Sequence, residues 1–212
     1  MTQAKFWDGV AERYSRDKIA DPDAYEYTLA RTQSYLSAQD RVIELGAGTS
    51  STALRLATSV DRYLATDGSS EMVRIGRQKL ADTAIENLEI DTGSFATEAF
   101  AGAGFDKVLA FNVLHLVPDI PRALGQVHGM LATNGLFISK TACLGSNPNP
   151  LKRLLFRVMV PVMQLIGKAP RPVHFPKVEE LDAMVEAAGF EILETGNYPA
   201  NVPSRYVVAR KV

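Results

Sequence analysis

Residues 42–51 read VIELGAGTSS, an apolar run followed by a turn that contains Gly46 and Gly48. Glycine has no Cβ, so the backbone of such a turn can bend sharply and approach a ligand closely. Asp67 lies 19 residues past Gly48, at the end of the next apolar run. A carboxylate in this position can accept hydrogen bonds from both hydroxyls of a ribose. The spacing therefore predicts a ligand that contains a ribose.

The glycine turn leaves two classes of ligand open. A dinucleotide site favours G-x-G-x-x-G, whose third glycine would stand at Ser51. A methyl-donor site favours G-x-G-x-G, whose third glycine would stand at Ser50. Glu44 favours the second class, because an acid just before the turn would repel a pyrophosphate and attract a cationic sulfonium. About 40 residues of mostly helical pattern before the turn favour it too.

Two histidines and one cysteine are the other candidates for chemistry. His115 follows an apolar run at 107–112 and is a candidate base or substrate hydrogen-bonding group, with a histidine packed on the pocket wall as the alternative. His174 is a candidate for lining the acceptor pocket, with an exposed loop position as the alternative. Cys143 is the only cysteine, which excludes a multi-cysteine metal site. We predict no metal site and expect a small buried residue at Cys143.

The elements that position these residues alternate between strand and helix patterns up to residue 141. Apolar runs predict strands at 41–45, 62–66, 107–112 and 136–140, and 88–91 is a short strand candidate. Helical spacing predicts helices at 51–58, 70–80 and 120–131, the last stopped by Asn134-Gly135, and two helices within 5–38 that separate near 21–23. This alternation is typical of a doubly wound, Rossmann-like α/β fold with a mostly parallel sheet and helices on both faces.

The pattern changes after residue 141. The turn-rich stretch GSNPNP leads into a predicted helix at 151–168, which Pro161 would kink or split. A helix at 177–188 and strands at 190–195 and 206–210 follow. The loop GNYPANVPS between these strands suits a hairpin. We therefore expect a seven-stranded sheet with an antiparallel C-terminal pair.

The composition predicts one domain over residues 1–212, with a helical cap at 1–38 and a lid insertion at 142–176. The chain is 46% hydrophobic and 22% charged, with a formal net charge of -1. This charge disfavours nucleic acid as a partner. No signal sequence or membrane-spanning segment is predicted, so we expect a cytoplasmic protein. Residues 120–178 nevertheless contain eight Lys and Arg residues and no Asp or Glu.

Four motifs resemble, in order and spacing, those of class I S-adenosylmethionine-dependent methyltransferases. They read VIELGAGTS, YLATDGSSEMVRIGRQK, FDKVLAFNVLHLVPD and MLATNGLFISK. The chain is most similar to the small bacterial enzymes related to the ubiquinone and menaquinone biosynthesis methyltransferases, from Phe6 to the C-terminus. The resemblance implies S-adenosylmethionine as the cofactor and methyl transfer as the activity.

The resemblance also implies the residues of the cofactor site. Asp67 would bind the ribose hydroxyls, and Asn112 would offer its backbone carbonyl to the cofactor's amino group. Tyr14, on a helix that would fold over the cofactor, would reach the methionine carboxylate, with a purely hydrophobic anchor as the alternative. The other implied residues are Glu44, Gly46, Ala47 and Gly48 beside the methionine part, Gly68 beside the ribose, and Met72, Ser94 and Phe95 around the adenine.

Two residues of this set depart from the family pattern. Ser50 replaces the last glycine of the turn, which is tolerable if its backbone stays in an ordinary region, and its hydroxyl could then reach the carboxylate. Ser94 stands where many relatives have an aspartate, and its hydroxyl would bind the adenine amino group less strongly than a charged acceptor. We expect weaker cofactor binding from these changes, not its loss.

The predicted lid indicates the class of acceptor. Apolar residues at helical spacing in 151–168, with Arg153 and Arg157 on another face, favour a small hydrophobic or anionic acceptor. Because a sulfonium donor is already activated, we expect the methyl group to move by direct in-line transfer. The lid could contact a membrane surface, pack on the domain or form a dimer contact, so monomer and homodimer both stay open. The rival functions are a non-catalytic protein that keeps the cofactor fold for binding or regulation, and a nicotinamide-dependent reductase.

Overall fold

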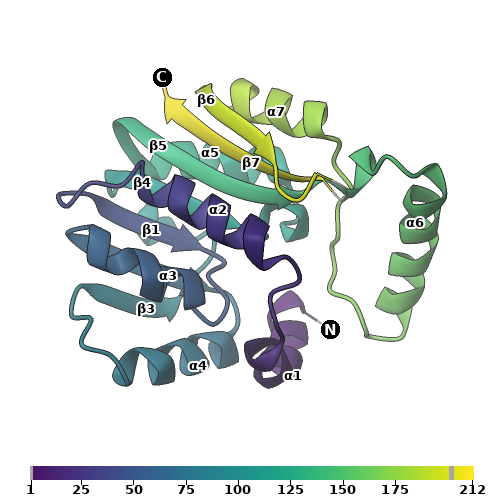
Figure 1. The fold of residues 1–212 in the computed structure, drawn as a ribbon, viewed down its shortest axis with the longest axis horizontal. Helices are drawn as coiled ribbons and strands as arrows, with labels where there is room; N and C mark the ends of the chain where they lie inside the picture. Colours follow the sequence, from purple (N-terminus) through teal and green to yellow (C-terminus); the bar gives the residue numbers. More distant parts are fainter. Residues whose placement is uncertain (1, 201–202) are drawn as a thin grey trace.

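The apolar runs of the sequence form seven strands of one sheet, in the order β3-β2-β1-β4-β5-β7-β6 (Figure 1). The computed structural model describes residues 2–200 and 203–212. The strands are β1 (Arg41–Leu45), β2 (Arg62–Asp67), β3 (Leu88–Thr92), β4 (Phe105–Phe111), β5 (Leu131–Ala142), β6 (Phe190–Asn197) and β7 (Ser204–Lys211). Strands β1 to β5 pair in parallel, whereas β7 pairs antiparallel with both β5 and β6. The predicted Rossmann-like sheet and its antiparallel end are confirmed.

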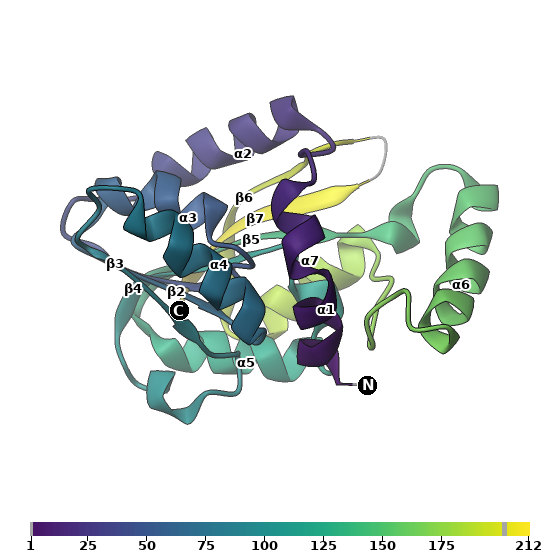
Figure 2. The same ribbon diagram turned by 90° about the horizontal axis from the view of Figure 1, so that it is seen from below.

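Helices cover both faces of the sheet (Figure 2). One face carries α2 (Pro22–Gln33), α3 (Ser51–Leu56) and α4 (Ser70–Ala81), and the other carries α5 (Ile120–Met130) and α7 (Val178–Ala187). Within β1, Val42 belongs to the same buried cluster as Leu56 of α3, and Ile43 belongs to the buried cluster on the other face, which contains Leu124 of α5. Because β1 is buried on both faces, its sequence is apolar without the alternation of a half-exposed strand.

Local signals in the sequence fix where the helices begin. Thr2, Asp21, Ser69, Asp119 and Asn149 each precede a helix, and the side chain of each accepts a hydrogen bond from a backbone N–H of the first turn. Two of these helices are α1 (Gln3–Arg16) and α6 (Pro150–Leu165). Proline at the first or second position of α2, α5 and α6 has a suitable fixed φ and lacks an N–H that would have no partner there.

The predicted helix stop at Asn134-Gly135 is wrong. Strand β5 begins at Leu131, directly after α5, and both residues lie inside it. The register with β4 shifts there, from Phe105↔Leu131 to Lys107↔Leu136, so the intervening residues of β5 form a bulge. Asn134 has a φ of 61°, a left-handed conformation that asparagine tolerates better than most residues. The Asn-Gly pair therefore shapes an irregular strand.

Other boundaries differ by a few residues. The helix predicted at 51–58 is α3 followed by the 3-10 turn η1 (Ala57–Ser59), and β4 begins two residues before the predicted strand. Pro161 lies inside α6, which continues through it and is not split. Residues 201 and 202 of the predicted hairpin loop lie outside the described residues.

Two helices occupy distinctive positions relative to the sheet. Helix α1 lies across one end of the sheet, beside α4, and α6 stands apart from the other helices (Figures 1 and 2). In the part of the chain that the structure describes, none of the helices combines the length and the hydrophobicity needed to cross a membrane.

Candidate cofactor-binding site

The turn after β1 and the end of β2 form one hydrogen-bonded unit. The backbone N–H of Gly48 donates to Oδ2 of Asp67 at 2.8 Å, and that of Ser69 donates to Oδ1 at 2.8 Å. Gly46 and Gly48 have φ values of 70° and 55°, which favour glycine. A Cβ on Gly46 would lie 2.5 Å from Cγ2 of Val113, so only glycine fits at this position.

The Asp67 carboxylate has remaining capacity for a ligand. Burial raises the pKa of this carboxyl, while hydrogen bonds from the amides of Ser69 and Gly48 lower it. Each oxygen accepts one of these amide hydrogen bonds, and an ionised carboxylate offers about four lone-pair positions in all. Two further donors, such as the two hydroxyls of a ribose, can therefore bind here.

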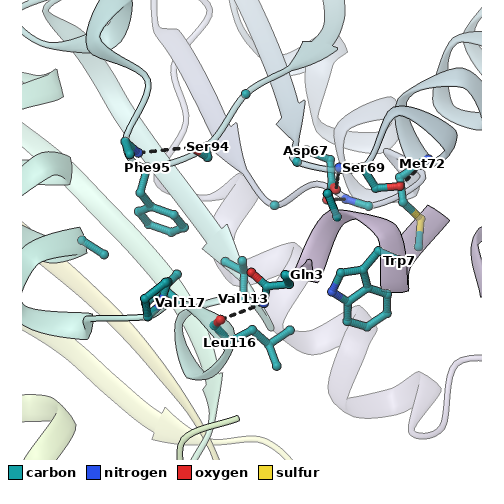
Figure 3. A pocket seen from close by; sticks show the side chains of 18 of the residues that line it. Gln3, Trp7, Asp67, Ser69, Met72, Ser94, Phe95, Val113, Leu116 and Val117 are labelled. Carbon is teal, nitrogen blue, oxygen red and sulfur yellow. Dashed lines mark hydrogen bonds between the residues drawn. The ribbon is translucent and has the colours of Figure 1, made fainter. Parts of the chain in front are cut away.

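A cavity of about 470 Å³ opens beside this carboxylate (Figure 3). Nine of the twelve predicted cofactor residues line it, namely Tyr14, Gly46, Gly48, Asp67, Gly68, Met72, Ser94, Phe95 and Asn112. In Figure 3, Asp67 and Met72 lie on one side of the cavity, and Ser94 and Phe95 lie on the other. The structure thus brings together residues that come from the ends of β1, β2, β3 and β4.

Helix α1 covers the cavity and is fixed on both sides of it. Asp8 accepts hydrogen bonds from Oγ of Ser69 at 2.6 Å and from the N–H of Glu71 at 3.2 Å, both at the start of α4. Nε2 of Gln3 donates to the carbonyl of Leu116 at 2.7 Å, in η3 (Leu114–Leu116). Sequence reasoning missed Gln3 and Asp8, because their partners are distant in the chain and the pattern of α1 shows only which face is apolar.

Tyr14 lies at the C-terminal part of α1 and lines the cavity, although 49% of the residue is exposed. Burial of the phenol raises its pKa, and the nearby charges of Asp67 and Glu44 raise it further. The hydroxyl is therefore protonated at neutral pH and can donate a hydrogen bond to a carboxylate. Cε1 of Tyr14 lies 3.6 Å from the position that a Cβ on Gly48 would take, so the ring faces the glycine turn.

Glu44 and Ala47, two of the predicted cofactor residues, do not line the cavity. Glu44 is only 2% exposed and accepts a hydrogen bond from the hydroxyl of Tyr63 at 2.7 Å. Burial raises the pKa of Glu44 to about 7, against the opposing effect of the Tyr63 hydrogen bond. Successive strand residues point to opposite faces, so Glu44 shares the face of β1 that carries Val42, on the side of the sheet where Tyr63 lies. The N–H of Ala47 donates to the carbonyl of Thr66 at 2.9 Å, which fixes the turn from the β2 side.

Ser50 also lies outside the cavity lining, and its backbone is not in the ordinary region that was the condition for tolerating serine at this position. It has a φ of 57°, so the turn demands a left-handed residue where the family pattern has glycine. Its Oγ lies 2.8 Å from the position that a Cβ on Gly76 of α4 would take, and it has no hydrogen-bond partner among the described residues. The hydroxyl therefore packs between helices and does not reach toward a ligand.

His115 and His174 contact each other outside the cavity. The N–H of His174 donates to the carbonyl of His115 at 2.7 Å, so the segment after α6 is tied to η3. Nδ1 of His115 and Nε2 of His174 are buried and have no hydrogen-bond partner in the described part of the chain. Burial, and then the charge of His174, lower the pKa of His115 to about 4. The predicted role of His115 as a base is not supported, because the ring does not line the cavity and has little basicity at neutral pH.

Replacing His115 with Gln is expected to make the fold less sensitive to acid. The folded-state pKa lies below the ordinary value of 6.5, so the neutral ring stabilises the fold above pH 6.5 and this contribution is lost as the pH falls toward 4. The wild type should lose roughly 2–3 kcal/mol more than the variant between pH 7 and pH 4.5. Urea unfolding of both proteins at the two pH values measures this difference. Equal losses would show that His115 titrates normally.

The remaining predicted residues lie apart from the cavity. Arg153 and Arg157 are exposed on α6, where Nη1 of Arg153 donates to the carbonyl of Asn147 at 3.1 Å. Cys143 is buried, as expected, and burial raises the pKa of its thiol to about 11. Among residues 2–200 and 203–212, no group of three or more His, Cys, Asp or Glu side chains is placed to bind a metal ion.

The cavity extends beyond the predicted cofactor residues. Its further wall is formed by residues of the loop after β4 and of α5, which include Val113, Leu116, Val117, Asp119, Arg122 and Gln126. The motif FNVLHLVPD could have predicted this wall, because its apolar residues directly follow a strand that ends at the edge of the sheet where ligands bind.

A carboxylate beside a glycine turn is common to several α/β classes, so the order of the strands decides between them. Here β7 is inserted antiparallel between β5 and β6, which together with the site defines a class I S-adenosylmethionine-dependent methyltransferase. Residues 36–189 match the family described as methyltransferase domain, and the chain belongs to this family.

Individual relatives agree with this assignment. The chain is 26% identical over 138 residues to an uncharacterized methyltransferase of Bacillus subtilis, YcgJ, which covers 65% of this chain but only about half (54%) of that relative. It is 24% identical over 185 residues to the demethylmenaquinone methyltransferase of Geobacillus stearothermophilus, covering 79% of this chain and 77% of the relative. The crystal structure of a SAM-dependent methyltransferase from Methanosarcina mazei superposes with a TM-score of 0.70 at 16% identity, covering 85% of this chain and 96% of the other.

Proposed function

We propose that this protein transfers a methyl group from S-adenosylmethionine to a small, apolar acceptor by direct in-line displacement. The observation that carries the proposal is the Asp67 carboxylate, which is fixed by the amides of Gly48 and Ser69 and faces a cavity of about 470 Å³. We further propose that residues 1–212 act as one domain, in which the N-terminal helices form a cap and 142–176 form a lid.

The residues around the cavity fit this cofactor. Gly46 and Gly48 adopt left-handed backbone angles without a side chain, so the turn presents its backbone directly to the cavity and a donor can approach it closely. Asp67 would bind the ribose hydroxyls, and Met72 and Phe95 supply apolar surface suited to a planar base. When bound, the cofactor supplies a methyl group on a positively charged sulfur, which is already activated for transfer.

The chain's own residues would contribute positioning and exclusion of water. Helix α1 covers the cavity through the hydrogen bonds of Asp8 and Gln3, which limits the access of solvent to the reacting groups. Among the described residues that line the cavity, the carboxyl groups belong to Asp67 and Asp119, and Asp119 caps α5 by accepting a hydrogen bond from the N–H of Arg122. The lining supports catalysis by orientation, without a dedicated base.

The wall beyond the cofactor residues supports an apolar acceptor. Val113, Leu116 and Val117 present hydrophobic side chains to the cavity. The relative from Geobacillus stearothermophilus is named for demethylmenaquinone, a quinone-type acceptor. We therefore infer a quinone-, lipid- or aromatic-like acceptor for this chain.

A methyl-transfer assay tests the proposal. The protein is incubated with methyl-labelled S-adenosylmethionine and a cell extract separated into lipid and aqueous fractions, and mass spectrometry identifies the labelled products. We expect label in compounds of the lipid fraction. Label in aqueous compounds alone would contradict the apolar acceptor. Cofactor binding without labelled product in either fraction would favour the non-catalytic alternative.

A further inference from the structure

Helix α6 carries a row of exposed apolar side chains along one side. Leu151, Leu154, Val158, Val162 and Leu165 are between 51% and 78% exposed. At 3.6 residues per turn these five positions fall within an arc of about 80°. We call this row the outer face of α6. No residue of α6, which lies wholly in the described part of the chain, is buried.

The opposite side of α6 is less exposed than this row. Phe156, Val160 and Met163 are partly buried and lie about half a turn away from the outer face. These three side chains are partly covered, whereas the outer face is left exposed. Five large apolar side chains on one exposed helix face are more than scattered surface residues, and such a patch marks an interaction site.

Positive charge surrounds this face. Lys152 and Arg157 lie on the two flanks of the outer face, and Lys168 and Arg171 follow the helix. No Asp or Glu occurs between residues 120 and 178. An apolar face with cations beside it suits the surface of a bilayer that contains anionic lipids, where apolar side chains enter the acyl boundary and cations contact phosphates.

The charge pattern also argues against a second copy of the chain as the occupant. In a two-fold dimer the same patch meets itself, so the outer face would bring the cations of both copies together. The absence of Asp and Glu from 120–178 leaves no acid in this segment to neutralise them. A self-pairing contact would be opposed by like-charge repulsion, whereas an anionic surface would be favoured.

We propose that the outer face of α6 docks the protein on an anionic lipid surface. The C-terminal end of α6 also borders a hollow of about 270 Å³, lined by Leu165 and Arg171 on one side and by Phe6 of α1 on the other. Trp7, the next residue of α1, lines the cofactor cavity. Docking would therefore bring the lipid surface near the helix that covers the cofactor site. This consequence rests on the proposed function, whereas the docking itself does not.

Vesicle sedimentation with the full chain tests the docking. Phosphatidylcholine vesicles are compared with vesicles that also contain phosphatidylglycerol, at low and high salt. We expect binding to the anionic vesicles that weakens as salt rises. The double variant Leu154→Gln and Leu165→Gln should lower partitioning by about a hundredfold. The double variant Lys152→Glu and Arg157→Glu should lower it by at least about fivefold for each changed charge.

Matched controls separate docking from misfolding and from the proposed function. Leu193→Gln changes a leucine that is 43% exposed on β6, and Arg62→Glu reverses an exposed charge at the start of β2. Both should partition like the wild type, and all variants should keep the wild-type dissociation constant for S-adenosylmethionine. The proposal is overturned if the wild type does not bind anionic vesicles. If vesicle binding is absent and size-exclusion chromatography shows a dimer that the Leu154 and Leu165 changes dissociate, the outer face is a contact between two copies of the chain.

Discussion

Replacing Asp67 with Asn is expected to lower the affinity for S-adenosylmethionine by at least about a hundredfold. Hydrogen bonds to a charged group contribute about 1.5–3 kcal/mol each, and a ribose would make two of them with this carboxylate. Asn also has a single acceptor oxygen, and the amides of Gly48 and Ser69 already occupy both carboxylate oxygens of Asp67. The amide group of Asn would therefore leave one backbone donor without its partner as well as bind the ribose poorly.

Isothermal titration calorimetry measures this loss, and Asp91→Asn provides the matched control. Asp91 lies on the neighbouring strand, paired in register with Thr66, but its carboxylate is exposed and bonds Arg77 outside the cavity. This control should retain the wild-type affinity. Thermal unfolding of the Asp67 variant shows whether the turn remains folded. If a folded Asp67 variant bound S-adenosylmethionine with an affinity within a few-fold of the wild type, the carboxylate of Asp67 would not be the group that binds the ribose.

Replacing Gly46 with Ala is expected to destabilise the fold and to abolish cofactor binding. A left-handed conformation costs a non-glycine residue about 1–2 kcal/mol, and inserting a methyl group into a packed site costs about 1–3 kcal/mol. Both apply, because Gly46 has a φ of 70° and its added Cβ would lie 2.5 Å from Cγ2 of Val113. The sum corresponds to a fall in melting temperature on the order of 10 °C for a chain of this size.

Two companion variants test this explanation of Gly46 by calorimetric melting. Gly125→Ala, in α5, adds a Cβ with no atom within 4 Å and should change stability by at most about 1 kcal/mol, in the stabilising direction. Adding Val113→Ala to Gly46→Ala removes the clashing methyl groups and should recover part of the loss. If Gly46→Ala melted like the wild type, the turn would not have the geometry described above.

Most of the sheet could be predicted because several of its strands carry a strong local signal. The runs VIEL, YLAT and VLAF are apolar without alternation, which indicates parallel strands buried on both faces, and the prolines and glycine of the last loop indicate a hairpin. The pairing of the Gly48 turn with Asp67 followed from their spacing, since both stand at the ends of strands that the fold places side by side.

Other parts of the site depend on contacts that no local pattern encodes. The contacts of Gln3 with Leu116 and of His115 with His174 join distant segments. Only the family resemblance implied that the N-terminal helix covers the site, and no local pattern showed which contacts fix it there or that the two histidines lie outside the cavity lining. The family resemblance implied Glu44 beside the methionine part of the cofactor. The hydrogen bond that the Glu44 carboxylate accepts from Tyr63 could not be predicted, because it joins two neighbouring strands. Ser50 has a left-handed φ of 57°, a backbone angle that the presence of a serine does not predict.

The most direct test of the cofactor site is a crystal structure of the protein bound to S-adenosylmethionine. We expect both ribose hydroxyls within hydrogen-bonding distance of the Asp67 carboxylate and the adenine between Met72 and Phe95. A cofactor bound elsewhere, or a different nucleotide occupying the Asp67 carboxylate in preference to S-adenosylmethionine, would contradict the account.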